Sequence, residues 1–438
     1  MARLISRYSI WALAAFAFAA SQVVNAKSVY CHYMIGTVNE GSGHAELDVD
    51  QAQALGFDAF ALNIGRPGEP WARTTIRQLF DYADSKDFKL FFSLDFHQTA
   101  DINEYTQLVS DFINRPSYLT AGPDGHPVIS TFSVGSVGPD GFRSWMQDNF
   151  NGQVYFLPNA DTSPGYNDPD AWFQQWGGVV DGVFGWETAW PAPGNSPANV
   201  SDAVDTVVQE AAHGRQKTYM APLSSLQYKK CCGGHYYRIG EVNLPQRMTQ
   251  LLSLQPDFVE VLTWNDAGES HYIGNNWAEG LSKEILDYSD TDHWPHFGWQ
   301  PLIASFIAAY KDGKDAASMA PPNGVQAVGA LWYRPIFKTA SCQKPGNWQS
   351  AIDAVNYAIV IGSDASDLQI RVTSGGQVIG ESPAHAGLNY ASVPGIRAGP
   401  QKVEVVRGSS VVMTAASVVD VAETNADCFF NFHVVGLE

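Results

Sequence analysis

Two acidic residues lie just beyond an apolar run in the stretch "FVEVLTWNDAGES", residues 258–270. The first half is β-branched and aromatic, as expected of a buried strand, and the second half places Asp266 and Glu269 three positions apart. Acids at this spacing are often only a solvated helix face, so their position at a strand end carries the argument. Cleavage of a glycosidic bond needs one protonated and one ionised carboxyl group. We therefore predict that Asp266 and Glu269 form a catalytic pair.

Other acids leave alternatives open. Glu187, in "GWETAW", also ends an apolar run and could pair with Asp266 or Glu269 across the same opening. Asp95 follows another run, although an acid in that place often only caps the next helix.

Polar and aromatic residues gather at the ends of the other apolar runs as well. Aromatic faces stack on sugar rings, and amides and acids hydrogen-bond to sugar hydroxyls, so this composition is typical of a carbohydrate site. The predicted substrate-binding residues are His32, Asn63, Asp95, His97, Asn159, Trp186, Glu187, Trp190, Trp264, Asn265, His271 and Tyr272.

The elements that must position these residues are short apolar runs separated by helical patterns. In the helical pattern over residues 74–87, Ile76, Leu79, Phe80 and Ala83 fall on one face. Eight such units over roughly 290 residues are typical of a (β/α)8 barrel, whose active site lies at the carboxyl ends of its strands. A doubly wound sheet is less favoured because no glycine-rich loop follows the first run. The runs span 28–36, 58–65, 89–97, 127–133, 153–160, 179–190, 218–226 and 258–270.

The pattern changes after residue 313. Residues 314–324 form a loose linker, and from residue 325 short alternating strands are separated by Gly, Ser, Asp and Pro. We predict a catalytic barrel over 27–313, followed by an all-β sandwich domain over 325–438.

The N-terminus and the composition indicate where the protein acts. Residues 1–26 carry two arginines ahead of an apolar run and small residues at the end, which predicts a signal peptide and a secreted, extracellular or wall-bound protein. Asn199 begins an N-glycosylation triplet. The 438 residues have a formal charge of −19, which argues against nucleic-acid and membrane partners. We expect a monomer.

Five cysteines suit an oxidising compartment without forming a dense framework. Cys342 and Cys428 are predicted to pair, and Cys31 to be a buried thiol, whereas adjacent Cys231 and Cys232 could be bridged or free. We expect no metal and no cofactor, since zinc-ligand spacing is absent. The loop "NADTSPGYNDPD" has acids that could hold calcium, but its sequence is more typical of a plain turn. Histidines at strand ends are more often neutral hydrogen-bonding groups than metal ligands.

The motif "WNDAGESHYIG" resembles the signature of glycoside hydrolase family 71, the fungal endo-1,3-α-glucanases or mutanases. "ALNIG", "FFSLDF", "FGWETAWP", "MAPLSS" and "HFGWQPLIASFIAAYKDG" look like its other landmarks, in order, over essentially the whole chain after the signal peptide. The resemblance implies a secreted, metal-independent hydrolase of α-1,3-glucan that inverts configuration, with Asp266 and Glu269 as the catalytic pair. Our assignment is Glu269 as general acid and Asp266 as general base.

Two departures from the family pattern are "CHYMIGT" in the first run and Phe96-His97 after the third, which could alter substrate contacts. Two other functions stay open on the sequence alone. One is a barrel glycosidase for a differently linked polysaccharide, and the other is a secreted carbohydrate-binding wall protein without turnover.

Overall fold

The computed structural model of the chain describes residues 27–39, 41–424 and 427–438. The predicted signal peptide, residues 1–26, lies outside the described residues. Within the described ranges, no helix has the length and apolar character required to cross a membrane.

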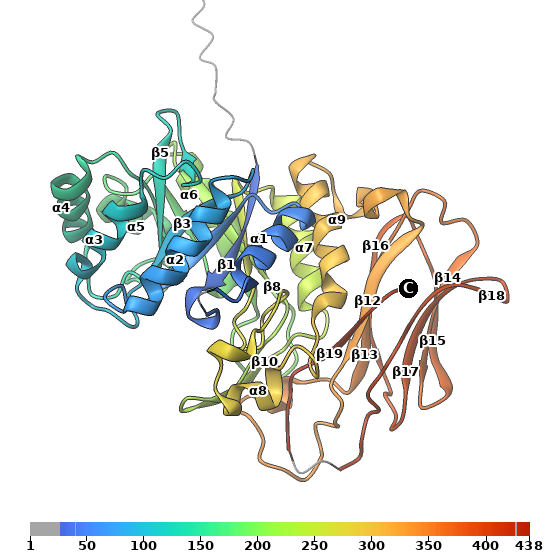
Figure 1. Cartoon of the computed structure of the whole chain (residues 1–438). Coiled ribbons are helices and arrows are strands. Elements are labelled where there is room, and N and C mark those ends of the chain that lie inside the picture. Colours follow the sequence, from blue (N-terminus) through green and yellow to red (C-terminus); the bar gives the residue numbers. More distant parts are fainter. Residues whose placement is uncertain (1–26, 40, 425–426) are drawn as a thin grey trace, which may run out of the picture.

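The first part of the chain contains all eight predicted parallel strands (Figure 1). Their interiors are almost completely buried, which explains why they are apolar on both faces. They are β1 (Ser28–Met34), β2 (Ala59–Ile64), β3 (Lys89–Asp95), β5 (His126–Phe132), β6 (Tyr155–Pro158), β7 (Gly182–Phe184), β8 (Thr218–Ser224) and β11 (Phe258–Leu262).

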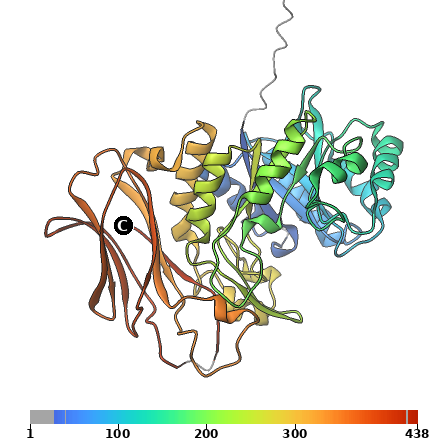
Figure 2. The same ribbon diagram turned by 180° about the vertical axis from the view of Figure 1, so that it is seen from behind.

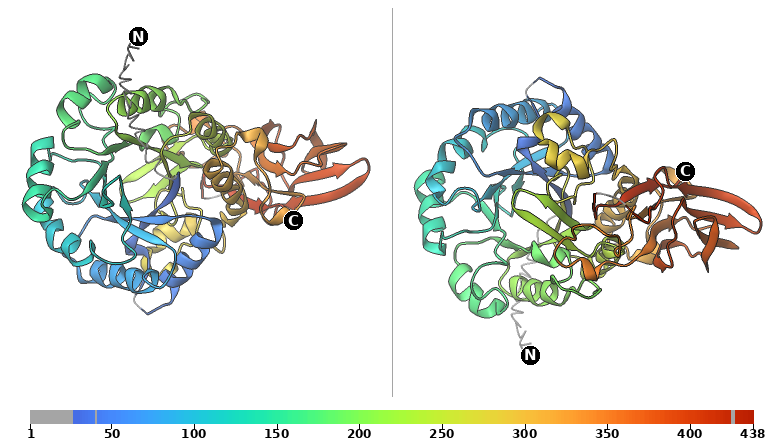
Figure 3. Two further views of the ribbon diagram at one scale, coloured as in Figure 1. Left: turned by 90° about the horizontal axis from the view of Figure 1, so that it is seen from above. Right: turned by 90° about the horizontal axis from the view of Figure 1, so that it is seen from below.

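These strands form one curled sheet, seen end-on in Figure 3. The pairing runs β6-β5-β3-β2-β1-β11-β8-β7, and all these neighbours are parallel. The isolated bridge between Asn159 and Phe184 brings the ends of β6 and β7 together. The short strand β4 (Thr120–Ala121) extends β5 with an antiparallel pairing. All carboxyl ends of the parallel strands therefore lie at one edge of the sheet.

Helices surround the outside of the curled sheet (Figures 1 and 3). Helix α2 shows why: Ile76, Leu79, Phe80 and Ala83 are all fully buried, as its 3.6-residue periodicity predicts, and Pro70 occupies its first turn. The helices are α1 (His44–Leu55), α2 (Pro70–Ala83), α3 (Thr106–Phe112), α4 (Pro139–Phe150), α5 (Pro169–Trp176), α6 (Ala203–His213), α7 (Asn243–Leu254), α8 (Lys283–Ser289) and α9 (Gln300–Lys311).

A hairpin of two strands, β9 (Gln227–Cys231) and β10 (Gly234–Arg238), follows β8 directly. The sequence analysis did not predict it. Because only two residues separate it from the carboxyl end of β8, it lies at the edge of the sheet where the acids lie.

The C-terminal part consists of two antiparallel four-stranded sheets, ordered β16-β13-β12-β19 and β15-β14-β17-β18. Side chains of both sheets share one hydrophobic core, including Leu331, Val355, Ile370 and Val403. Figure 2 shows the two sheets from behind. The strands are β12 (Ala327–Tyr333), β13 (Ala354–Ile361), β14 (Leu368–Ser374), β15 (Gln377–Pro383), β16 (Gly387–Pro394), β17 (Gln401–Arg407), β18 (Ser410–Ala416) and β19 (His433–Gly436).

The two parts of the chain pack against each other. The Trp332 indole donates to the carbonyl of Glu241 at 2.7 Å, and its ring lies 5.8 Å from that of Trp299. The amide of Asn431 donates to the carbonyl of Tyr288 at 2.8 Å, so the last segment of the chain contacts helix α8.

The cysteines follow most of the sequence predictions. Cys342 and Cys428 form a disulfide, and Cys31 is a buried free thiol. Cys231 and Cys232 are both free thiols at the end of β9, with their sulfur atoms 2.7 Å apart.

Candidate active site

The loop after β11 is folded so that its two acids face each other. A backbone hydrogen bond from Thr263 to the carbonyl of His271 closes the loop at 2.7 Å. The Thr263 hydroxyl accepts from the backbone N–H of Asp266 at 2.8 Å, and the Asp266 carboxylate accepts from the N–H of Glu269 at 3.0 Å. These short-range side-chain bonds favour a turn over a continued helix or strand.

A buried histidine joins the two carboxylates. The Nε2 atom of His271 lies 3.2 Å from Asp266 Oδ2 and 3.7 Å from Glu269 Oε2. His271 is fully buried, whereas the side chains of Asp266 and Glu269 are 18% and 25% exposed. The two acids are therefore partly open to solvent, and the buried His271 ring lies behind them.

The β9–β10 hairpin covers Glu269 with polar groups. The Gln227 amide donates to Glu269 at 2.6 Å, and the Lys229 ammonium donates at 3.4 Å. Gln227 and Lys229 point to the same face of β9 because they are two residues apart, and their register partners on β10 are Arg238 and Tyr236. One face of this hairpin thus lines the acid pair.

The electrostatic surroundings favour an ionised Asp266. Burial alone raises the pKa of Asp266, but the hydrogen bond and charge of His271, the N–H of Glu269 and the Lys229 cation together hold it below its usual value. Lys229 in turn has a pKa above its usual value, because the attraction of Glu269 and Asp266 outweighs its own burial.

Aromatic rings form a wall next to the acids. Trp190 and Trp186 lie edge-on to His271, with ring centroids 5.5 Å and 6.3 Å away. Trp186 also contacts Phe132 at 4.5 Å and His32 at 4.9 Å. Residues from β1, β5 and the segment after β7 thus converge on the loop after β11.

The ring of His32 is oriented by Glu260, a buried acid of β11. Its Nδ1 atom lies 2.7 Å from the carboxylate of Glu260, which is fully buried in the middle of β11. Burial raises the pKa of Glu260, although the hydrogen bond from His32 opposes that rise. Sequence reasoning missed Glu260, whose signal was an acid inside an otherwise apolar strand.

Four other predicted contact residues end neighbouring strands. His97 is exposed and its ring lies 5.1 Å from Phe132, so it belongs to the same aromatic wall. Asp95 accepts from the N–H of His97 at 2.9 Å, and burial raises its pKa. Asn63 is nearly buried at the end of β2, and the Asn159 amide donates to the carbonyl of Phe184 at 3.2 Å.

Besides His271, three further predicted contact residues are completely buried. Trp264 packs on Phe60 in the core behind the loop, with ring centroids 5.4 Å apart. Asn265 binds both backbone groups of Met34, and Tyr272 donates to the carbonyl of Trp294 at 2.6 Å. The structure therefore gives these three residues positions that support the loop, with no surface open to a substrate.

Glu187 lies at the same opening but is paired with a cation. Its side chain is 51% exposed and its carboxylate accepts from Arg238 at 2.8 Å. Arg238 also donates to Gln227 at 3.4 Å, and Gln227 donates to Glu269. A continuous set of hydrogen bonds therefore links Glu187 to Glu269.

The acids of the loop at residues 159–170 have structural partners. Asp161 accepts from the backbone N–H groups of Trp186 and Glu187 at 2.5 and 2.6 Å. Asp168 caps α5, and Asp170 pairs with Arg215 at 2.7 Å. These roles fit the plain-turn interpretation of the loop.

Asp266, Glu269 and His271 each offer one ligand atom, and these atoms lie within 4.8 Å of one another. Such a group could hold a cation. The Lys229 ammonium, 3.4 Å from Glu269, already supplies one positive charge at this place.

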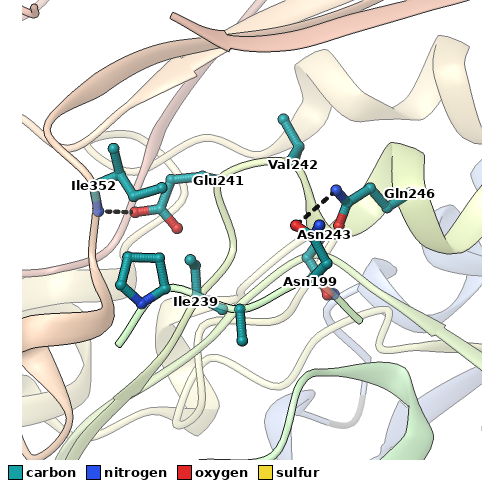
Figure 4. Close-up of a pocket in the computed structure, with 9 residues that line it drawn as sticks. Asn199, Ile239, Glu241, Val242, Asn243, Gln246 and Ile352 are labelled. Carbon is teal, nitrogen blue, oxygen red and sulfur yellow. Dashed lines mark hydrogen bonds between the residues drawn. The ribbon is translucent and has the colours of Figure 1, made fainter. Parts of the chain in front are cut away.

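A separate pocket of about 150 Å³ lies where the two parts of the chain meet (Figure 4). Its lining includes Asn199, Glu241, Gln246 and Ile352. Glu241 accepts from the N–H of Ile352 at 2.7 Å, and Asn199 accepts from Gln246 at 3.0 Å. The pocket is smaller than a typical ligand site and its acid is already bonded.

Cleavage of a glycosidic bond requires a carboxyl pair, and the pair here lies beside an aromatic wall at the carboxyl ends of parallel strands, an arrangement suited to the class of glycoside hydrolases. The profile of Glycosyl hydrolase family 71 matches residues 25–437. The chain belongs to that family.

Curated relatives agree with this assignment. A mutanase of Penicillium rubens is 28% identical, over 93% of this chain and 88% of the relative. An ascus wall endo-1,3-alpha-glucanase of Schizosaccharomyces pombe is 29% identical, over 93% and 96%. A glucan endo-1,3-alpha-glucosidase of the same yeast is 32% identical, over 72% of each chain.

Among solved structures, a GH99 endo-alpha-mannosidase from Bacteroides thetaiotaomicron superposes with a TM-score of 0.51 at 10% identity. The match covers 66% of this chain and 98% of that one. At this identity the likeness shows a shared fold and no more.

Proposed function

We propose that the protein is a secreted endo-acting hydrolase of α-1,3-glucan that uses Asp266 and Glu269 as its catalytic carboxyl groups. The observation that carries the proposal is that both acids lie partly exposed around the buried His271, beside the wall of Trp186 and Trp190. The substrate follows from the names of the curated relatives, which are α-1,3-glucanases and a mutanase.

Asp266 acts as general base in this proposal. Its lowered pKa keeps it ionised, as a group that accepts a proton from water must be. Glu269 acts as general acid and gives its proton to the leaving glycosidic oxygen. His271 fixes both side chains from behind, and the hairpin residues Gln227 and Lys229 orient Glu269.

The stereochemical outcome depends on the space between the acids. Inverting enzymes separate the two carboxyl groups by about 6.5–9.5 Å so that a water fits between them. One carboxylate oxygen of Asp266 and one of Glu269 lie within 4.8 Å of each other, which leaves little room for that water. We therefore propose that Glu269 swings away from Asp266 toward the bound sugar, and that hydrolysis inverts configuration from that arrangement.

The architecture that presents this site is proposed as a complete (β/α)8 barrel over 27–313. The bridge between Asn159 and Phe184 supports closure of the ring between β6 and β7. A linker over 314–324 joins it to a β-sandwich domain over 325–438, supported by the shared core of the two C-terminal sheets.

Residues 1–26 direct secretion as a signal peptide. The mature enzyme acts as a monomer and carries a glycan on Asn199, which is exposed.

One assay tests substrate and stereochemistry together. The purified protein is incubated with a panel of insoluble glucans, and the first products are followed by NMR. We expect soluble products from α-1,3-glucan and initial β-anomers, because inversion of an α-linkage gives the β form. Initial α-anomers would reject inversion, and cleavage of a differently linked glucan alone would reject the substrate.

Lys229→Met should move the pH dependence of catalysis. The Lys229 cation helps to keep Asp266 ionised, so its removal raises the pKa of Asp266. When its pKa is higher, Asp266 becomes protonated at a higher pH and can no longer act as a base. The acid limb of the pH profile of kcat/KM should therefore move to higher pH by up to about one unit. Lys230→Met is the matched control, because Lys230 lies over the ring of Phe429. An unmoved acid limb in Lys229→Met would contradict the role given to this cation.

A further inference from the structure

Trp71 is unusual among the aromatic residues of the chain. It is 46% exposed, whereas every other described Trp, Phe and Tyr is buried or intermediate. Within the described part of the chain, its ring has no aromatic or cationic partner. The exposed face of the Trp71 indole therefore adds little to the packing of the fold and is open to contact another molecule.

Trp71 is placed at the edge of the sheet that carries the acids. It is the second residue of α2, which follows the carboxyl end of β2. Its ring lies beside Gly36, in the turn after β1, where an added Cβ would meet the indole at 3.4 Å. Gly36 is itself exposed, so the absence of a side chain there leaves this edge of the indole uncovered.

The turn beside Trp71 is hydrogen-bonded to the loop after β11, which carries the two acids. Asn265, the neighbour of Asp266, accepts from the N–H of Met34 at 2.8 Å and donates to the hydroxyl of Thr37 at 2.6 Å. Gly36 lies between those two anchor points. The turn beside the indole is therefore hydrogen-bonded on both sides of Gly36 to Asn265, the residue next to Asp266.

A second aromatic surface borders the same turn. Trp277 is partly exposed and stacks on His44 with ring centroids 3.6 Å apart and planes 4° from parallel. Gly280 approaches Thr37 so closely that an added Cβ would lie 2.5 Å from its backbone. The turn after β1 is thus flanked by Trp71 on one side and by the segment after Trp277 on the other.

We infer that Trp71 is a platform that stacks on a glucose ring of the polysaccharide beyond the reacting unit, with the His44–Trp277 pair extending the same track. The inference rests on the proposed function, and it adds a determinant of chain length. A short oligomer that fills only the region around Asp266 and Glu269 would not reach Trp71. A polymer would lie across the turn after β1 and bury the indole face.

The test separates polymer binding from chemistry. Trp71→Ala is compared with the unsubstituted protein for pelleting with insoluble α-1,3-glucan, in a Glu269→Gln background that prevents digestion. Loss of one stacked aromatic face should weaken polymer binding about tenfold. In the active background, Trp71→Ala should raise the half-saturating concentration of polymer by a similar factor, with hydrolysis of a short soluble α-1,3-linked glucose oligomer unchanged.

Two further variants control for folding and surface hydrophobicity. Trp71→Phe keeps a stacking ring and should retain most polymer binding. Val207→Ala removes another exposed apolar side chain, 46% exposed on α6, and should bind polymer like the unsubstituted protein. The inference is overturned if Trp71→Ala pellets normally, or if it loses short-oligomer hydrolysis as much as polymer hydrolysis. If the unsubstituted protein cleaves no α-1,3-glucan, the proposed function fails, and pelleting of Trp71→Ala with the glucan that is cleaved still tests the platform.

Discussion

Asp266→Asn should lower kcat on α-1,3-glucan by about 10²- to 10⁴-fold, the range for loss of a positioned acid or base. The amide is nearly isosteric and can still accept from the N–H of Glu269, so the loop should keep its shape. What is lost is the ability to take a proton from the attacking water. The measurement is initial rate against polymer, with circular dichroism and the melting temperature confirming that the variant is folded.

Glu269→Gln should cause a loss of the same size for a different reason, and the two roles can be separated. A substrate with an activated aryl leaving group does not need a proton donor, so it should restore much of the rate of Glu269→Gln. It should not restore the rate of Asp266→Asn, because the water still needs a base. The opposite pattern would exchange the two assignments, and full activity in either variant would remove that residue from the mechanism.

Asp205→Ala should lower the free energy of unfolding by about 3–5 kcal/mol, because it leaves a buried cation unpaired. Asp205 and Arg247 are both fully buried, and the two guanidinium nitrogens lie 2.7 and 2.8 Å from the carboxylate. The hydroxyls of Thr188 and Tyr219 donate to the same carboxylate at 2.8 and 2.6 Å. Urea unfolding followed by tryptophan fluorescence measures the change.

Two controls identify the cause of that loss. Asp140→Ala removes an exposed acid that pairs with Arg143, and it should change stability by no more than about 0.5 kcal/mol. The double variant Asp205→Leu with Arg247→Met replaces the ion pair by apolar groups and should recover a large part of the stability. If Asp205→Ala unfolds at the same urea concentration as the unsubstituted protein, the buried pair does not stabilise the fold.

The strand pattern could be predicted because burial on both faces leaves a plain signal in the sequence. All eight runs of the first part became strands, although the run at 179–190 shortened to Gly182–Phe184. The hairpin of β9 and β10 was missed because its two strands mix lysine, tyrosine and cysteine instead of alternating apolar and polar residues. The Gly233-Gly234 pair, where the chain enters β10, was the available turn signal.

The grouping of the candidate site residues could be predicted where a residue's place at the end of a strand determines its place in the fold. Asp266, Glu269, His271, Trp186 and Trp190 came together because the carboxyl ends of parallel strands meet at one edge. Side-chain direction could not be predicted in the irregular loop after β11, where no period applies. Trp264 and Tyr272 therefore turned into the core, and Gln227, Lys229 and Arg238 entered the site from a hairpin that the sequence pattern did not reveal.

The contact between Asn431 and α8 connects the C-terminal part of the chain to the loop of the two acids. Asn431 binds the backbone of Tyr288, and the hydroxyl of Tyr288 donates at 2.8 Å to the carbonyl of Gly268, which lies between the two acids. The loop that carries the two acids is thus supported by a residue more than a hundred and fifty positions further along the chain. The C-terminal sheets and the loop of the two acids are therefore coupled through α8, and removal of the segment around Asn431 would leave the Tyr288 carbonyl without this partner.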